Sequence, residues 1–243
     1  MPRFFAHPRD ITADQVFLDP ETLAHLRVLR LRPDETFIIC DGEGTDYTCV
    51  LHTCAFDGEL AQIISSAPNE AEPSIDCPIY LAYTRGERMD YAIQKSVEMG
   101  ATRIILFPSE RCVVKYESKA LPKKLTRWEK IAEEAAKQSG RGRIPAVETS
   151  PSFKEAMTQA AEADCPLFFY EGEQERTLRM ALDRDQKPKS VSLVIGSEGG
   201  FAEQERDLAV ELGLIPVTLG KRILRCETAP IAALAGALLY LED

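Results

Sequence analysis

The stretch Leu193-Val-Ile-Gly-Ser-Glu-Gly-Gly-Phe201 decides how the fold is interpreted. A short apolar run ends at Ile195 and passes directly into a turn with three glycines within five residues, which predicts a buried strand followed by close backbone approach to a ligand. Ligands of open parallel sheets bind at the carboxyl ends of the strands. A plain strand-to-helix turn, the structural alternative, needs only one glycine.

Strands and helices alternate on both sides of this stretch from residue 77 onward. Such alternation predicts βαβ units, and hence an α/β domain with a parallel sheet covered by helices. The strands are expected at 79–83, 103–107, 166–170, 191–195 and 215–219, and the helices near 87–99, 121–139, 152–163, 203–212 and 228–241.

The amino-terminal part has a different pattern. Asp19-Pro20 predicts a helix start, since Asp is a good N-cap and Pro a good first helical residue. Three strand-like runs follow at 36–41, 47–55 and 59–66, which predicts a small antiparallel sheet or barrel. The polar, proline-containing segment 68–76 is interpreted as a linker. We therefore expect one domain over 1–72 and a second over 73–243.

A second unusual loop follows the predicted strand at 215–219. It reads Thr218-Leu-Gly-Lys-Arg-Ile-Leu-Arg-Cys-Glu-Thr-Ala-Pro230, and it places Arg222, Arg225 and Glu227 within six residues. These residues either serve chemistry or form an Arg–Glu pair that seals the start of the next helix. That helix, 229–241, is apolar on all sides, which predicts burial in the core or against a second subunit.

Charge is unevenly distributed along the chain, whose net charge is −10. Residues 111–143 contain ten basic and four acidic residues. A solvated helix with Lys/Glu pairs is the ordinary explanation. The glycine in Arg141-Gly142-Arg143 is expected to leave both arginines free to reach a phosphate. A local polyanion-binding surface is therefore one option on an acidic protein.

Composition excludes several classes of protein. No apolar run reaches the length of a membrane span, and the start MPRFFAHPRD has no signal-peptide core, so we expect no membrane association. Seven scattered cysteines without a CxxC pair favour reduced thiols in a cytoplasmic protein. The three histidines lie far from other ligands at metal spacing, so no metal site is expected. Neither GxGxxG nor GxxxxGK[ST] occurs, and Glu198 would repel a phosphate in its own loop.

Five motifs occur in an order that resembles the RsmE family, SPOUT-class methyltransferases of 16S ribosomal RNA. The two carboxy-terminal ones are IGSEGGF at 195–201 and TLGKRILRCETA at 218–229. The others are HLRVLR at 25–30, RGERMDYAIQKSVEMG at 85–100, and SER at 109–111 followed by Trp128 through QSGR at 138–141. The family usually has Pro where this chain has Ser197, and serine leaves the loop less rigid.

The resemblance implies a fold and a reaction that the spacing alone does not give. It implies a PUA-like β-barrel, then a parallel-sheet SPOUT domain with a trefoil knot that binds S-adenosylmethionine, in an obligate homodimer. The implied reaction is methylation of N3 of one uridine in the decoding region of 16S RNA, in the small ribosomal subunit. Removal of the imide proton or stabilisation of the anion is then required.

The candidate residues fall into three groups. For catalysis they are Arg225, which would stabilise the uracil anion, and Glu227 or Glu198 as the base, with Glu198 alternatively accepting adenosine hydroxyls. For the cofactor they are Phe169, Tyr170, Glu171, Ile195, Gly196, Gly199, Gly200, Leu219, Gly220, Ile223 and Leu224. For RNA phosphates they are Arg3, Arg9, Arg27, Arg30, Arg111, Arg141 and Arg143.

Three other functions are weighed against this one. A nucleotide-dependent oxidoreductase should show GxGxxG after the first strand of the sheet, and 83–87 has a single glycine. A non-catalytic RNA-binding or assembly protein would not need the intact glycine loops. A SPOUT methyltransferase with another target RNA differs only in substrate, and the full-length match favours 16S RNA.

Overall fold

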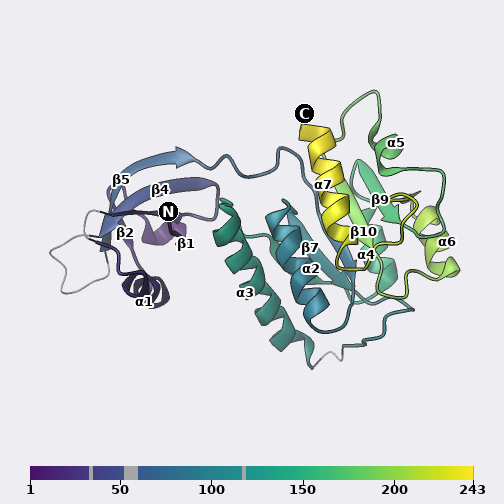
Figure 1. The fold of residues 1–243 in the computed structure, drawn as a ribbon, viewed down its shortest axis with the longest axis horizontal. Coiled ribbons are helices and arrows are strands. Elements are labelled where there is room, and N and C mark those ends of the chain that lie inside the picture. Colours follow the sequence, from purple (N-terminus) through teal and green to yellow (C-terminus); the bar gives the residue numbers. More distant parts are fainter. Residues whose placement is uncertain (33–34, 52–59, 117–118, 243) are drawn as a thin grey trace. The chain divides into compact units, whose positions relative to one another are not determined.

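The computed structural model describes residues 1–32, 35–51, 60–116 and 119–242 (Figure 1). The predicted strand ends at 52–55 and 59, together with His52 and Cys54, lie outside the described residues. The chain forms two compact units: Met1–Glu72 with Ala136–Ile144, and Pro73–Ala135 with Pro145–Asp243. The second segment of the first unit takes in the end of a long helix and the Arg141-Gly142-Arg143 loop.

The first unit is built on a five-stranded sheet with the order β1-β3-β4-β5-β2. Its strands are β1 (Arg3–Phe5), β2 (Gln15–Phe17), β3 (Thr36–Cys40), β4 (Thr45–Leu51) and β5 (Leu60–Pro68). β1 pairs with β3 in parallel, and the other pairs are antiparallel. The three predicted strands are confirmed within the described residues. β1 and β2 were not predicted, because three-residue strands carry too little alternation to be recognised.

One short helix and a 3-10 turn complete the first unit. The turn is η1 (Pro8–Asp10), and the helix is α1 (Pro20–Leu29). The Asp19 carboxylate accepts hydrogen bonds from the backbone N–H groups of Glu21 and Thr22, at 2.8 and 3.0 Å. The predicted cap is therefore confirmed. Leu26 of this helix is buried in the same core as Phe4, Phe37 and Ile39.

The second unit is built on a six-stranded, all-parallel sheet with the order β11-β9-β10-β6-β7-β8. The strands are β6 (Ile79–Ala82), β7 (Arg103–Phe107), β8 (Ala146–Thr149), β9 (Cys165–Phe169), β10 (Val191–Ile195) and β11 (Ile215–Val217). The predicted parallel sheet is confirmed. β8 was not predicted, because its four residues are mostly exposed and carry no apolar run.

Six helices belong wholly or mainly to this unit (Figure 1). They are α2 (Glu87–Glu98), α3 (Leu121–Ser139), α4 (Phe153–Ala160), α5 (Leu178–Leu182), α6 (Glu203–Glu211) and α7 (Ala229–Glu242). The five predicted helices are confirmed within three residues at each end. The five-residue α5 was missed, since it is too short to show a helical period.

Helix α7 is only partly buried, although its sequence is apolar all round. It packs against α2, α5 and β10. The buried residues form one stripe, namely Pro230, Ala233, Leu234, Ala237, Leu238 and Leu241. Leu239 is 69% exposed. The expectation of burial is thus met on one face, and this chain leaves the other face uncovered.

The order of the strands places the two unusual loops together. β10 lies between β6 and β9, and β9 also pairs with β11. All strands point the same way, so the segments after β6, β9, β10 and β11 leave the sheet at one edge. The glycine loop therefore lies near residues 83–86 as well as 170–172.

Candidate functional site

The glycine loop 196–200 is held closely against its own chain. A Cβ atom on Gly199 would lie 2.9 Å from both the Cβ and the carbonyl oxygen of Arg111. Gly200 has a φ of +65°, and a Cβ there would lie 2.8 Å from Oε1 of Glu171. Arg111 also donates a hydrogen bond to the Gly199 carbonyl at 3.3 Å. These two glycines are therefore required by close packing and by backbone geometry.

Glu198, at the centre of this loop, is bound by the segment that follows β6. Its Oε1 accepts hydrogen bonds from the backbone N–H of Arg85 at 3.1 Å and from Nη1 of Arg88 at 3.3 Å. The Glu198 side chain is 17% exposed, and that of Arg88 is 49% exposed. The loop is thus attached to the first turn of α2 by a charge-assisted pair.

Three buried side-chain oxygens near this pair have no hydrogen-bond partner among the described residues. They are Oε2 of Glu198, Oγ of Ser197 and Oγ1 of Thr84. Because buried polar atoms are normally satisfied, a group of orphaned ones is typical of a site that binds a ligand. These atoms flank the point where β6 and β10 end.

A cavity of about 530 Å³ opens beside them. Its lining consists of Arg85, Gly86, Glu87, Arg88, Val113 and Glu198. Gly86 has a φ of +60°, and a Cβ built on it would meet nothing within 4 Å. The cavity therefore combines two cations, two carboxylates and an open stretch of backbone, within the size range of small-molecule sites.

Glu227 lies on the other unusual loop, and its environment differs from that of Glu198. Its Oε2 accepts a hydrogen bond from Sγ of Cys226 at 3.2 Å, and its Oε1 lies 4.0 Å from Nη1 of Arg225. Burial opposes ionisation, but the Cys226 hydrogen bond and the charges of Arg88 and Arg225 lower the pKa of Glu227 below its usual value. Glu227 is therefore held in its ionised form.

Cys226 itself stays a thiol. Burial, its hydrogen bond to Glu227 and the charge of Glu198 together raise the pKa of Cys226 to about 12. The charge of Arg88 acts on both Cys226 and Glu227. Arg225 points outward, with 79% of its side chain exposed.

The remaining candidate cofactor residues lie at the same edge of the sheet. Phe169 and Ile195 end β9 and β10 and are buried, whereas Tyr170 is half-buried and Glu171 is exposed. Gly220 has a φ of +104° with open space beside it, and Ile223 is 85% exposed. Leu219 and Leu224 are half-buried. The glycine loop is closely packed against its neighbours, whereas the residues of 219–224 are half-buried or exposed.

Sequence reasoning missed Arg85, Arg88 and Val113 as site residues. Arg85 and Arg88 stood within a family-like motif, at the start of a predicted helix, so their position after the first strand of the sheet was a usable signal. What no local pattern gave was their partner, since Arg88 and Glu198 are 110 positions apart.

The candidate RNA-contacting arginines do not share one environment. Arg9, Arg27, Arg30, Arg111 and Arg143 are exposed. Arg3 instead forms a two-pronged pair with Asp46, with both N···O distances at 2.6 Å. Arg3 is therefore engaged with Asp46, and its contact with an RNA phosphate stays a prediction.

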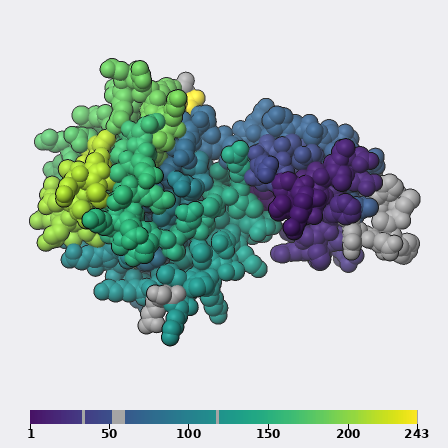
Figure 2. All heavy atoms as spheres, turned by 180° about the vertical axis from the view of Figure 1, so that it is seen from behind, coloured from purple at the N-terminus to yellow at the C-terminus, as the bar shows by residue number. Residues whose placement is uncertain are grey.

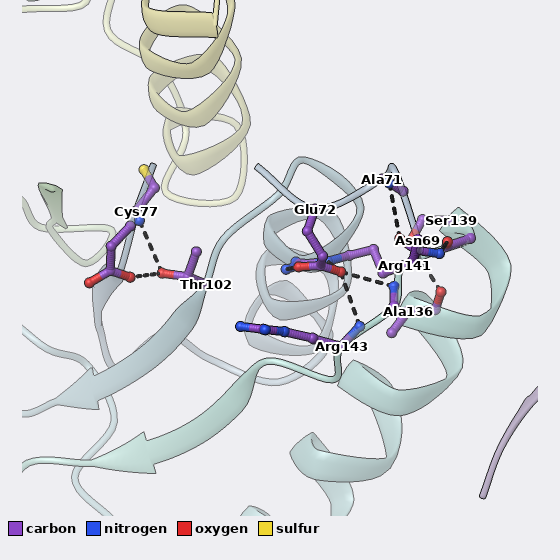
Figure 3. A network of polar contacts seen from close by, with 12 residues as sticks. Asn69, Ala71, Glu72, Cys77, Thr102, Ala136, Ser139, Arg141 and Arg143 are labelled. Carbon is purple, nitrogen blue, oxygen red and sulfur yellow. Dashed lines mark hydrogen bonds and ion pairs between the residues drawn. The ribbon is translucent and has the colours of Figure 1, made fainter. Parts of the chain in front are cut away.

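Arg141 is also engaged within the protein (Figure 3). Its side chain is 3% exposed, and its Nη2 lies 2.7 Å from Oε2 of Glu72. The Gly142 and Arg143 N–H groups also donate to Glu72, and a Cβ on Gly142 would lie 2.6 Å from Cβ of Asn69. The prediction that Gly142 frees Arg141 is wrong, since this glycine serves close packing.

We expect the Arg141→Ala substitution to destabilise the first unit by about 3 kcal/mol, because it leaves the Glu72 carboxylate without its guanidinium partner. Urea unfolding followed by circular dichroism measures this change. Arg143→Ala, which removes an exposed side chain, is the matched control and should cost less than about 0.5 kcal/mol. Equal midpoints for the two variants would contradict the structural role of Arg141.

Other ligand types find little support in the part of the chain that the structure describes. No group of three or more His, Cys, Asp or Glu side chains is placed to hold a metal ion there. The six described cysteines are buried free thiols. Among the same residues, no helix has the length and apolar character needed to cross a membrane.

Comparison with known proteins agrees with this architecture. Residues 71–238 match the model of an RNA methyltransferase domain, and residues 18–52 match that of an RNA methyltransferase PUA domain. The chain is 33% identical to ribosomal RNA small subunit methyltransferase E of Bacillus subtilis over 88% of this chain and 86% of that one. Its identity to the Mesomycoplasma hyopneumoniae protein of that name is 33% over 95% and 96%.

Two solved structures are similar over nearly their whole length. One is a ribosomal RNA small subunit methyltransferase E from Neisseria gonorrhoeae bound to S-adenosyl methionine, with a TM-score of 0.83, 33% identity and coverage of 99% of this chain and 98% of that one. The other is a Legionella pneumophila protein in complex with the cofactor SAM, with a TM-score of 0.86, 29% identity and coverage of 98% and 97%. The predicted family is thereby confirmed: the chain belongs to the ribosomal RNA small subunit methyltransferase E family, and it is an RNA methyltransferase.

Proposed function

We propose that this protein transfers the methyl group of S-adenosylmethionine to N3 of one uridine in the decoding region of 16S ribosomal RNA, within the small ribosomal subunit. Family membership supports the substrate class. The single structural observation that carries the chemistry is the Glu198–Arg88 pair beside a cavity of about 530 Å³. The reaction belongs in the cytoplasm, where these subunits are assembled.

The edge formed by β9, β10 and β11 fits the cofactor. Close glycine packing on one side and the open backbone at Gly220 on the other leave main-chain groups for a nucleoside and an amino acid. When bound, the cofactor supplies a methyl group activated by a positive sulfonium. We propose that it is held in a trefoil knot, as the family implies, by Phe169, Tyr170, Glu171, Ile195, Gly196, Gly199, Gly200, Leu219, Gly220, Ile223 and Leu224.

Glu198 is the acceptor of the N3 proton in this proposal. Uracil N3 becomes a nucleophile only when its imide proton is removed. One oxygen of Glu198 is fixed by Arg85 and Arg88, whereas Oε2 accepts from no donor in the part of the chain that the structure describes. This oxygen is therefore the part of the carboxylate that is open to the imide proton.

Glu227 has the opposite properties and serves a different role. Its lowered pKa makes it a weaker base than an ordinary glutamate. We assign to it the positioning of Arg225, whose guanidinium lies 4.0 Å away. Arg225 is then available to stabilise the charge that develops on the uracil oxygens.

The exposed arginines of each unit contribute phosphate contacts. They are Arg9, Arg27, Arg30 and Arg143 in the first unit and Arg111 in the second. Such contacts position the RNA without reading its sequence. A flipped-out base would supply the specificity for one nucleotide.

We further propose that two copies associate through the uncovered face of α7. This helix is apolar all round, but only one stripe is buried by its own chain.

We expect Leu239→Glu to convert a dimer into a monomer, because a charge would replace a 69% exposed leucine at the centre of that face. Analytical ultracentrifugation measures the mass. Val210→Glu, an equivalent change on α6, should leave the mass unaltered, and a monomeric wild type would refute the interface.

The experiment that tests the function is methyl transfer with mapping of the product. Purified protein and labelled S-adenosylmethionine are mixed with small subunits that lack the modification, and separately with naked 16S RNA. Label on N3 of a single decoding-region uridine is the expected result. Label on another base or another RNA would show that the substrate differs from the one proposed. Absence of label from both the small subunits and the naked 16S RNA would refute the proposal.

A further inference from the structure

The segment that leads into α3 is the most basic part of an acidic chain. Residues 111–130 contain seven basic and two acidic residues, whereas the whole chain has a net charge of −10. This stretch belongs entirely to the second unit, which also contains the catalytic loops. It projects at the surface, where Figure 2 colours it teal.

The basic side chains of α3 lie on one face. Successive residues of a helix are rotated by about 100°, so Lys123, Arg127 and Lys130 lie within one narrow stripe. Trp128, Ala132 and Ala135 lie on the opposite side and are buried. The packing of α3 therefore turns the basic stripe toward solvent.

Three of the cations in this segment already have partners. Nη1 of Arg111 lies 3.8 Å from Oε1 of Glu171, and the other two are Lys124 and Arg127. Nζ of Lys124 lies 4.6 Å from the ring centre of Tyr116, in a cation–π contact. Arg127 pairs with Asp90 at 2.6 Å. The other lysines of the segment are exposed and form no ion pair with any residue that the structure describes; they are Lys115, Lys119, Lys123 and Lys130.

Like charges recur along the exposed face of α3. Lys/Glu pairs at spacings of three or four stabilise a helix, whereas like charges at the same spacing destabilise it by a similar amount. Lys123, Arg127 and Lys130 are like charges at those spacings, although Asp90 pairs with Arg127 and Glu134 follows Lys130 by four residues. A polyanion bound along the stripe would relieve this repulsion.

The basic segment 111–130 begins beside the cavity. Val113 lines that cavity, and Lys115 follows it by two residues. The hydroxyl of Tyr116 donates to the backbone carbonyl of Thr84 at 3.1 Å, which attaches the segment beside Arg85. The unpaired lysines therefore continue outward from the Arg85 and Arg88 side of the site.

We propose that four lysines bind consecutive phosphates of the RNA backbone on one side of the target nucleotide; they are Lys115, Lys119, Lys123 and Lys130. This surface, which we name the α3 lysine stripe, holds the substrate on the catalytic unit itself. The inference rests on the proposed function, since it assumes that an RNA nucleotide enters the cavity. Its occupant is RNA backbone, because exposed lysines that form no ion pair with any described residue match a polyanion.

The test compares two double variants by RNA affinity at several salt concentrations. The binding of 16S RNA is measured for Lys123→Gln/Lys130→Gln and for Lys154→Gln/Lys189→Gln, whose lysines are exposed elsewhere on this unit. Each lost phosphate contact lowers the slope of log K against log salt by about 0.7 to 0.9. We expect the stripe variant to bind roughly tenfold more weakly with a slope reduced by about 1.5. The control variant should match the wild type.

Further measurements separate this proposal from the proposed function. Affinity for S-adenosylmethionine should be unchanged in the stripe variant, and lowering the salt should restore its methyl transfer. A wild-type protein that methylates 16S RNA while the stripe variant keeps the full salt slope would overturn the stripe alone. A wild-type protein that neither binds nor methylates this RNA would overturn both. The variant Lys115→Gln/Lys119→Gln repeats the test on the part before the helix.

Discussion

The Gly199→Val variant is expected to bind S-adenosylmethionine roughly a hundredfold more weakly than the wild type. Even a Cβ atom at this position would lie 2.9 Å from the Arg111 backbone oxygen, and valine adds two methyl groups beyond it. Overpacking of this kind costs about 3 kcal/mol, and the loop must move to relieve it. Because β10 anchors one end of the loop, the movement displaces the backbone that would surround the cofactor. Isothermal titration calorimetry measures the affinity directly.

A matched control separates loop displacement from general damage. Gly213→Ala introduces a side chain at a glycine with a positive φ of +97°, where a Cβ meets nothing within 4 Å. This position follows α6, so the variant carries backbone strain away from the glycine loop. We expect it to lose some thermal stability and to bind the cofactor normally. Normal affinity in Gly199→Val would remove the loop from the pocket.

The Glu198→Gln variant is expected to lower the rate of methyl transfer by about a thousandfold, because it removes the acceptor of the N3 proton. Glutamine keeps the size of the side chain and one oxygen that can accept from Arg85 and Arg88. Affinity for RNA and for S-adenosylmethionine should therefore change little. Single-turnover methyl transfer with saturating RNA and cofactor measures the chemical step.

Two companion variants test whether Glu198 or Glu227 is the base and provide a control. Glu227→Gln should reduce the rate less than Glu198→Gln, because a carboxylate with a lowered pKa is the weaker base. Glu203→Gln, an exposed acid on α6, should be indistinguishable from the wild type. A larger loss in Glu227→Gln than in Glu198→Gln would exchange the roles of the two acids.

The catalytic sheet could be predicted well because its signals are local. Val191–Ile195 and Arg103–Phe107 are short apolar runs that the structure reproduces without change. Asp19 caps α1 through hydrogen bonds that reach only two and three residues along the chain. The missed elements, β8 and α5, have four and five residues, too few to show a period.

The candidate site was predictable only in part. The glycine loop and the Arg225–Glu227 segment were recognisable as motifs, whereas the pairing of Glu198 with Arg88 joins elements 110 positions apart. The environment of Arg141 was also not predictable from the residues around it in the sequence. Its partner Glu72 lies 69 positions away, and that pairing turned an apparently free phosphate ligand into a buried structural cation.

The sequence by itself determined the parallel α/β unit, the preceding β-rich unit, the helix caps and the family, because periodicity and capping act over a few residues and motifs are linear. Only the tertiary structure decided which charges are free. Burial and ion pairing depend on what the fold brings near a side chain, so Arg3 and Arg141 are neutralised by distant carboxylates. The lysines of the α3 stripe keep their charges open to solvent, since they are exposed and form no ion pair with any described residue.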